Sequence, residues 1–371
     1  MNLRIVFLFI SIIFLNNALA AKNNLNVLLI NPSIENDPFW HQVEALTKKA
    51  AEDLDIKLDV IYGNGNRFIQ LQVLKKYLSQ NEAPDYIMLV NYPGGALNTF
   101  DFLAKYPVKI ITLEQTISGK EKKSIGHPNG KFKNWVGEIF HDNKKASQLL
   151  ASRLFEKAKK KGKPLIVAGI SGHFGSESAI RNSGLVAVVD SYQAELKQIV
   201  YAQWSREDAY TKTFKLLKRY PNISILWCAS DEMALGAINA IKRMGLKPGK
   251  DIFVGGFDWI KEGINSIKKN EMTASVGGHF MMGAWGLLAI YDKEFGIDRL
   301  KKGNESTFEL ELIESDNIAA YSALFNQKFL MEVDFKRLSL FHSPTQTSSS
   351  FKLTDILKVN TTDTTKKTNT N

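Results

Sequence analysis

Short apolar runs alternate with amphipathic stretches along most of this chain. In the first third, four apolar runs are separated by stretches whose apolar residues recur at helical spacing. The runs are Val27–Ile30, Leu58–Tyr62, Tyr86–Val90 and Val108–Leu113, and the intervening stretches are Phe39–Leu54, Phe68–Leu78 and Leu97–Tyr106. This order predicts βαβαβαβ, a parallel sheet covered by helices with right-handed crossovers.

A second series of the same kind begins after the polar stretch Ser118–Lys133. The expected helices are Asn143–Lys159, Ser178–Tyr192, Arg206–Arg219 and Met233–Met244, and the strands that follow them are Leu165–Gly169, Leu196–Val200, Ile223–Cys228 and Ile252–Gly255. The series continues through Ile260–Lys269, Thr273–Val276 and Met282–Phe295. About 350 residues exceed what one core usually holds, so we expect an α/β protein of two similar doubly wound parallel-sheet lobes.

The two ends of the chain differ from this pattern. Arg4, the uncharged run Ile5–Leu15 and Ala18-Leu19-Ala20 form the three parts of a secretory signal peptide, so we expect residues 1–20 to be removed and the protein to reach the periplasm. A retained N-terminal anchor is the alternative, although the run is short for a transmembrane span. Residues 341–371 form a tail whose end, Thr361–Asn371, should be disordered. Within the tail, Phe351–Leu357 has helical spacing that would allow it to dock.

Composition narrows the class of protein. The only cysteine, Cys228, lies in an apolar strand, which favours packing over chemistry and excludes an internal disulfide. The formal charge of +10 is spread over lysine-bearing helix faces such as Lys157–Lys163. Nucleic-acid binding would require a basic stripe within a recognition motif, and none is present, so we read the charge as solvated surface.

Polar residues stand where apolar strands of the second series end. Ser230 and Asp231 follow Ile225–Cys228, and Phe257 and Asp258 follow Phe253–Gly256. In open parallel α/β sheets, ligands bind outside the carboxyl ends of the strands. Asp231 could instead cap the next helix. Trp204, after Leu196–Ala202, either walls the cleft or packs against the following helix.

The first series carries a comparable set. The loop from Asn31 contains Asn36 and Asp37, which could cap a helix that Pro38 opens, and the aromatic pair Phe39 and Trp40 follows. Large rings are buried in the core by default, so the binding role competes with plain packing. The remaining candidates are Glu114 and Gln115 after Lys109–Leu113, and Asn91, which lies before a Pro-Gly-Gly turn and has a turn role as its alternative.

Several of these stretches resemble the type I periplasmic solute-binding proteins and the related LacI-type sensor domains. The resemblance rests on the blocks Ser230–Ala237 and Gly256–Asp258, on the polar loop leading to Pro38-Phe39-Trp40, and on Arg181-Asn-Ser-Gly-Leu185. It implies that Trp40 stacks on a sugar ring and that Arg181 offers its fork of donors to the ligand, whereas a surface salt bridge is the plain alternative for Arg181. Gln115, Ser230 and Gly278 depart from the common sugar-binding pattern, and His279 could compensate for Gly278.

The resemblance also implies a domain organisation with three crossings between the lobes. We place them near Thr116–Lys123, Gly277–His279 and Lys301–Glu311, so that this three-strand hinge joins residues 21–120 plus about 279–305 to residues 121–278 plus about 306–340. A narrower resemblance, to receptors such as the autoinducer-2 receptor, rests on Asn134–Asn143, Ala274–Phe280 and Val333–Phe341.

Two classes of function are compatible with these residues, a binding protein and an enzyme. No phosphate loop, nucleophile elbow or zinc-spaced His/Cys set occurs, so we expect a binding protein without cofactor or metal rather than a carbohydrate-acting enzyme. The expected ligand is a small polar molecule, a sugar or sugar-like compound. A monomer would present it either to the membrane permease of an ABC importer or, as a receptor, to a membrane sensor kinase or cyclase.

Overall fold

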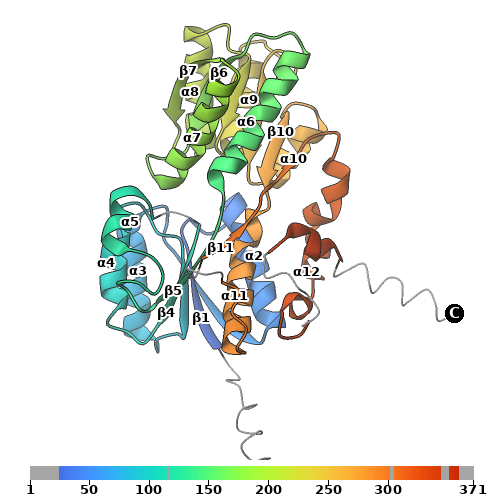
Figure 1. Cartoon of the computed structure of the whole chain (residues 1–371). Helices are drawn as coiled ribbons and strands as arrows, with labels where there is room; N and C mark the ends of the chain where they lie inside the picture. The colour runs from blue at the N-terminus through green and yellow to red at the C-terminus, as the bar shows by residue number, and fades with distance from the viewer. Residues whose placement is uncertain (1–24, 115–116, 301–304, 344–350, 359–371) are drawn as a thin grey trace, which may run out of the picture.

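The protein consists of two α/β lobes, one above the other in the view of Figure 1. The structure is a computed structural model that describes residues 25–114, 117–300, 305–343 and 351–358. The expected signal peptide and the last part of the tail therefore lie outside the described residues. The expected fold class, two lobes built on parallel sheets, is confirmed.

The first sheet has six strands among the described residues, in the order β11-β5-β4-β3-β1-β2. Their bounds are β1 (Leu25–Asn31), β2 (Ile56–Tyr62), β3 (Tyr86–Leu89), β4 (Lys109–Leu113), β5 (Trp135–His141) and β11 (Glu305–Phe308). Every neighbouring pair is parallel. The central strand β3 has no polar residue and is fully buried, as a strand covered by helices on both faces should be.

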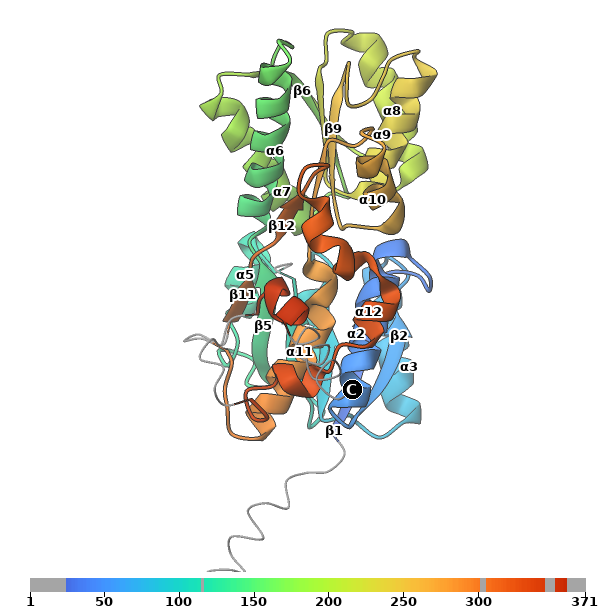
Figure 2. The same ribbon diagram turned by 90° about the vertical axis from the view of Figure 1, so that its right-hand side faces the viewer.

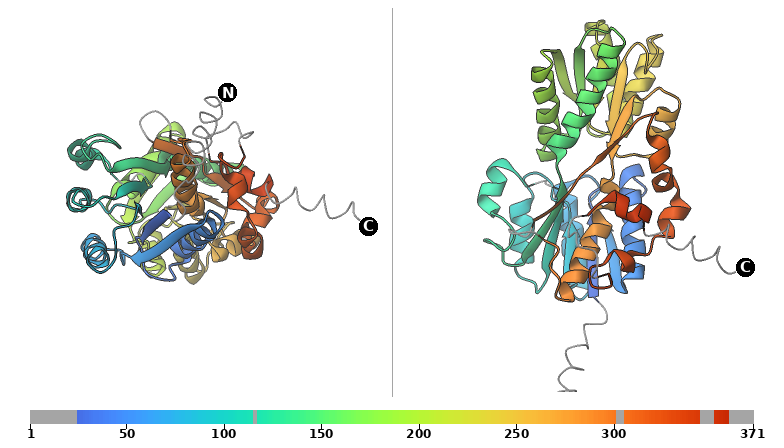
Figure 3. Two further views of the ribbon diagram at one scale, coloured as in Figure 1. Left: turned by 90° about the horizontal axis from the view of Figure 1, so that it is seen from below. Right: turned by 45° about the vertical axis from the view of Figure 1, so that its right-hand side comes forward.

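Helices cover both faces of the first sheet (Figure 3, left). One face carries α3 (Arg67–Gln80), α4 (Ala96–Leu103) and α5 (Gly119–Ile125), and the other carries α2 (Pro38–Asp53) and α11 (Met282–Glu294). Residues Met282 to Asp292 of α11 are all buried, because α2 and the C-terminal segments enclose this helix.

The second sheet repeats the order of the first, as β12-β10-β9-β8-β6-β7. Its strands are β6 (Ile166–Ser171), β7 (Glu195–Tyr201), β8 (Ile225–Cys228), β9 (Phe253–Phe257), β10 (Ala274–Gly277) and the antiparallel edge strand β12 (Glu311–Ile313). The helices α6 (Asn143–Lys160) and α7 (Ser176–Ser191) pack together, as do α8 (Arg206–Arg219) and α9 (Asp231–Arg243), with α10 (Lys261–Lys268) beside α9.

The chain crosses between the lobes three times, but the first crossing lies later than expected. It falls at Asp142, between β5 and α6, rather than near Thr116–Lys123, because β5 pairs with β4 in the first sheet. The sequence hides this strand: Glu138 interrupts its apolar run, although the side chain is buried and paired with Lys122. The other crossings lie at Gly278 and between β11 and β12, within the expected stretches.

The last described segments return to the first lobe and the hinge (Figure 2). We expected residues 306–340 in the second lobe, and β12 and the 3-10 helix η2 (Ile318–Phe325) do lie there, with Tyr321 and Phe325 against Trp259. However, α12 (Gln327–Met331) and η3 (Phe335–Leu338) pack against α2 of the first lobe. That part of the expected boundary was wrong.

The short helical piece expected in the tail does dock. Phe351 stacks on Trp285 of α11, with ring centroids 4.9 Å apart and planes 16° apart. Leu353 contacts Gly278 at the second crossing so closely that a β-carbon there would lie 2.4 Å from it. Gly278 also has φ +113°, a conformation that side chains disfavour, so the backbone favours glycine at this crossing.

Candidate ligand site between the lobes

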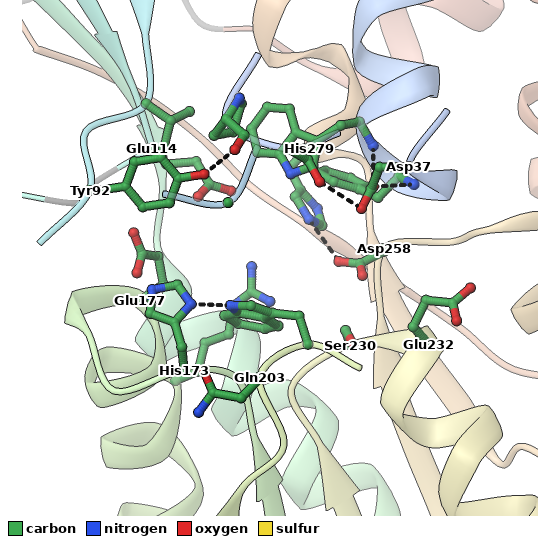
Figure 4. Close-up of a pocket in the computed structure, with 18 of the residues that line it drawn as sticks. Asp37, Tyr92, Glu114, His173, Glu177, Gln203, Ser230, Glu232, Asp258 and His279 are labelled. Carbon is green, nitrogen blue, oxygen red and sulfur yellow. Dashed lines mark hydrogen bonds and ion pairs between the residues drawn. The ribbon is translucent and has the colours of Figure 1, made fainter. Parts of the chain in front are cut away.

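A cavity of about 370 Å³ lies between the lobes, beside the crossings. Its lining comes from the loops at the carboxyl ends of the parallel strands in both sheets, the position where such sheets bind ligands (Figure 4). The lining residues from the first lobe include Ser33, Asp37, Phe39, Trp40, Asn91, Tyr92, Pro93 and Glu114. Those from the second lobe and the hinge include His173, Glu177, Arg181, Gln203, Trp204, Ser230, Glu232, Asp258 and His279.

Aromatic rings face the cavity from both lobes. At the start of α2, the backbone N–H groups of Phe39 and Trp40 donate to Oδ1 of Asp37, at 3.0 and 2.9 Å, so the predicted cap holds this first turn in place. Trp204 follows β7 and lies so close over Gly172 that no β-carbon could fit there. Its Nε1–H donates to His173 Nδ1. The cavity thus has an indole from each lobe.

Arg181, on α7, is the most firmly held polar group of the cavity. Its side chain is almost fully buried, which rules out the surface salt bridge. Nε donates to Oδ1 of Asn143 at 2.7 Å, and a terminal nitrogen donates to the carbonyl of Ala229 at 2.7 Å. Its guanidinium carbon also lies 4.6 Å from the centre of the Phe257 ring. Asn143 begins α6 directly after the first crossing, so the hinge itself orients this guanidinium.

Asp258 and His279 form a buried pair at the back of the cavity. His279 Nε2 lies 3.1 Å from Asp258 Oδ1, and we assign the proton to Nε2 because a carboxylate only accepts. Burial, and secondly the charge of Arg181, holds the pKa of His279 well below its usual range, so the imidazole is neutral. Burial raises the pKa of Asp258 to about 6, although Arg181 opposes the shift. Phe39 packs on the imidazole, with centroids 4.4 Å apart.

Two glutamates from opposite lobes complete the polar lining. Glu114 follows β4 and Glu177 lies in the first turn of α7, and both side chains are buried (Figure 4). Burial raises the pKa of Glu114 to about 7 against the effect of Arg181, with a further contribution from the charge of Asp258. Burial, followed by the charge of Glu114, raises the pKa of Glu177 to about 8. Oε2 of Glu177 is buried and has no hydrogen-bond partner among the described residues.

Most of the residues that we proposed from the sequence meet at this cavity. Those that line it are Phe39, Trp40, Asn91, Glu114, Arg181, Trp204, Ser230, Asp258 and His279. Ser230 also caps α9, because its Oγ accepts from Met233 N–H at 3.2 Å. Gln115 lies outside the described residues. Asn36 is exposed in its loop and is not among the lining residues.

Two proposed residues of the second lobe lie behind the cavity. Asp231 is fully buried: its Oδ1 accepts from Ser275 Oγ at 2.7 Å and its Oδ2 from Ile260 N–H at 3.1 Å. It therefore ties α9 to the neighbouring strand and loop. Phe257 is also fully buried, against Trp227 and Arg181. Phe257 is therefore not among the residues that line the cavity, whereas Trp204 is.

Other lining residues were not proposed from the sequence, notably Tyr92, Glu177 and Glu232. Glu177 resembles any acidic residue in the first turn of a helix, where the helix dipole favours it, so the sequence gives no separate signal. Glu232 pairs with Arg206 through two contacts of 2.7 and 2.8 Å. Within the described ranges, no cluster of side chains has a metal-binding arrangement, and no helix is long and apolar enough to cross a membrane.

Two similar lobes that enclose a polar and aromatic cavity beside three crossings define a two-lobe solute-binding protein. Residues 27–293 match the family described as "Periplasmic binding protein domain", and this chain belongs to that family. The resemblance to the type I periplasmic solute-binding proteins is thereby confirmed, as is the expectation of a binding protein rather than an enzyme. The narrower resemblance to receptors such as the autoinducer-2 receptor stays a prediction.

Individual relatives agree with this family. The chain is 27% identical over 265 residues to the D-allose-binding periplasmic protein of Escherichia coli, covering 70% of this chain and 81% of that protein. It is 26% identical to a ribose import binding protein of Bacillus subtilis, covering 67% and 74%. Among solved structures, a periplasmic sugar-binding protein from Pseudomonas fluorescens superposes with a TM-score of 0.79 at 27% identity, covering 90% and 99%.

Proposed function

We propose that this protein captures a sugar or a closely similar polyol between its lobes and delivers it to the membrane permease of an ABC importer. The observation that supports this most is the placement of Trp40 and Trp204 on opposite lobes, with Arg181 and buried carboxyl groups between them. Sugars present apolar C–H faces that pack on indole rings, and hydroxyls at their edges that pair with carboxylates and guanidinium groups. The names of the allose and ribose relatives support the same class of ligand.

Binding and closure would be coupled through the hinge. Because each lobe supplies part of the lining, a ligand gains its full set of contacts only when the lobes are close, and it stabilises the closed arrangement by that difference in affinity. Pro93 of the first lobe already reaches the loop of Gly175 in the second, where an added β-carbon would lie 2.8 Å from its ring. The permease would then recognise the closed form.

The test begins with the protein purified without added sugar. Denaturing it and analysing the released small molecules by mass spectrometry should identify a polyol, and thermal-shift and calorimetric titrations with pentoses and hexoses should show specific stabilisation. The ligand should be recovered chemically unchanged, and light scattering should report a monomer. An altered product at turnover, or no response to any sugar, would contradict the proposal.

The transport step needs a separate measurement. Uptake of the identified sugar should fall when the gene is deleted and return when it is restored. If uptake is unchanged while a sensor kinase or cyclase responds to the sugar only when this protein is present, the receptor function replaces the transport function.

A further inference from the structure

The carboxyl groups around the cavity fall into two sets. Asp37 already accepts hydrogen bonds from the backbone at the start of α2 and, at 2.9 Å on Oδ2, from Ser33 Oγ. Glu232 forms an ion pair with Arg206. The other three, Glu114, Glu177 and Asp258, are each about nine-tenths or more buried. These three share the cavity with one guanidinium, that of Arg181, since none of the other described lining residues is a lysine or an arginine.

Arg181 cannot balance three carboxylates. Two of its nitrogens already donate to Asn143 and Ala229, so only the remaining N–H groups of the guanidinium can bind a group in the cavity. Both histidines of the lining are held in the neutral form, since burial lowers the pKa of His173 and of His279. Tyr92 is the remaining titratable neighbour of Glu177. Its hydroxyl donates a hydrogen bond to the carbonyl of Pro32, and burial raises its pKa.

A buried carboxylate without a cation is costly, so such groups either hold a proton or meet a positive charge. Glu114 and Glu177 face each other across the cavity from opposite lobes, and the charge of Glu114 contributes to raising the pKa of Glu177 (Figure 4). Burial favours the protonated form of both groups, because it raises the pKa of Glu114 to about 7 and that of Glu177 to about 8. A neutral ligand leaves these two carboxyl groups protonated, whereas a cationic group between them would let both ionise as a compensated pair.

We propose that the natural ligand is a polyol bearing a basic amine, of the amino-sugar class, whose ammonium group lies between Glu114 and Glu177. An ammonium has three donors and no acceptor, which suits the two carboxylates and the unpartnered Oε2 of Glu177. The hydroxyls of the same ligand would pair with Arg181 and Asp258. This inference rests on the proposed function, since it specifies the chemistry of the same cavity, and it can fail without that function failing.

The first experiment compares ligands that differ in one group. D-Glucosamine, D-galactosamine and D-mannosamine are titrated calorimetrically beside the matching neutral hexoses and the N-acetylated forms, which keep the shape but lose the charge. At least one amine should bind roughly tenfold or more tighter than both of its matched compounds, as a charge-assisted hydrogen bond allows. If a neutral or acetylated sugar binds as tightly as its amine, this inference fails and the proposed function stands. If none of these sugars binds, and none is released from the purified protein, both fail.

The second experiment follows protons and the responsible side chain. At about pH 6.5, below the pKa of both glutamates, an ammonium ligand should force ionisation and release protons, seen as binding heats that depend on the ionisation enthalpy of the buffer. In Glu177→Gln the affinity for the amine, relative to that for its matched neutral sugar, should fall about tenfold. Glu156→Gln, on the outer surface of α6 beside Arg153, is the matched control and should change neither quantity. An unchanged preference in Glu177→Gln overturns the assignment.

Discussion

The two lobes share one architecture and differ in what they present to the cavity. The strands of the two sheets follow the same order, and each lobe turns the loops at the carboxyl ends of its strands toward the cavity between the lobes (Figure 3). The first lobe contributes Phe39, Trp40 and Glu114, whereas the second contributes Trp204 and the polar set of Glu177, Arg181 and Asp258. The frame is repeated, and the loops and helices that follow the strands carry the difference. We infer that the second lobe anchors the ligand and the first lobe closes over it.

The largest expected effect is from Arg181→Ala. Removing a buried cation from between Glu114 and Asp258 should weaken sugar binding by about 2–5 kcal/mol, measured by calorimetry. Because the side chain also joins Asn143 to Ala229, the melting temperature of the ligand-free protein should fall as well. Arg153→Ala on the exposed face of α6 is the control. Full affinity in Arg181→Ala would contradict the idea that the second lobe provides the anchor.

The pH dependence of the ligand-free protein sharpens the same contrast. Glu114, Glu177 and Asp258 have pKa values that folding raises to about 7, 8 and 6, so the folded state holds protons that the unfolded state has lost. Their contribution to stability is full below about pH 4 and is lost as pH rises through these values. For each group that keeps its proton only in the folded state, the free energy of unfolding falls by about 1.4 kcal/mol for each unit of rising pH in that window.

Thermal unfolding between about pH 6.5 and 8 checks this, because the histidines that folding holds neutral oppose the trend only at lower pH. The melting temperature should decrease with rising pH, and Glu177→Gln should flatten the upper part of the curve. A melting temperature that rises across the whole window would show that these carboxyl groups are ionised and compensated in the folded protein.

Asp231 and Asp258 offer a comparison within one lobe, since each follows a neighbouring strand. Asp231→Asn should destabilise the protein by about 1–3 kcal/mol, because one oxygen facing a donor becomes an NH₂ group. Its affinity for sugar, measured once folded, should stay close to that of the parent. Asp258→Asn should show the reverse, with weakened binding and a smaller change in stability. Denaturant unfolding and calorimetry on both variants decide the matter; equal losses of affinity would place Asp231 at the ligand after all.

The smallest effect concerns the aromatic walls. Trp135, Trp227, Trp259 and Trp285 are all buried, so we expect ligand-induced fluorescence changes to come from Trp40 and Trp204. Trp40→Phe and Trp204→Phe should each remove part of the signal and weaken binding by about 0.5–1.5 kcal/mol. Trp227→Phe serves as a control, with the signal retained. If both indole variants keep the full fluorescence change, the walls lie elsewhere.

The sequence by itself determined the α/β repeat, the bounds of most helices to within a few residues, and nine of the residues that line the cavity. Parallel strands bring their carboxyl ends to one edge, so polar residues after apolar runs, such as Glu114 and Asp258, can be placed without coordinates. The cap at Asp37 is equally local, because its donors are two and three residues away.

Only the tertiary structure decided which of these side chains reach the cavity. Asp231 and Asp258 both follow strands, but Ser275 and Ile260 hold Asp231 inside the lobe. Phe257 is turned away from the cavity because it packs on Trp227, and of the two alternatives left open for Trp204 the structure shows the one at the cleft, where Gly172 leaves room for the ring. The strand β5 was missed for a related reason: the buried charge of Glu138 is compensated by Lys122, from another element. Such pairings join residues far apart in the chain, so the local spacing of residues cannot predict them.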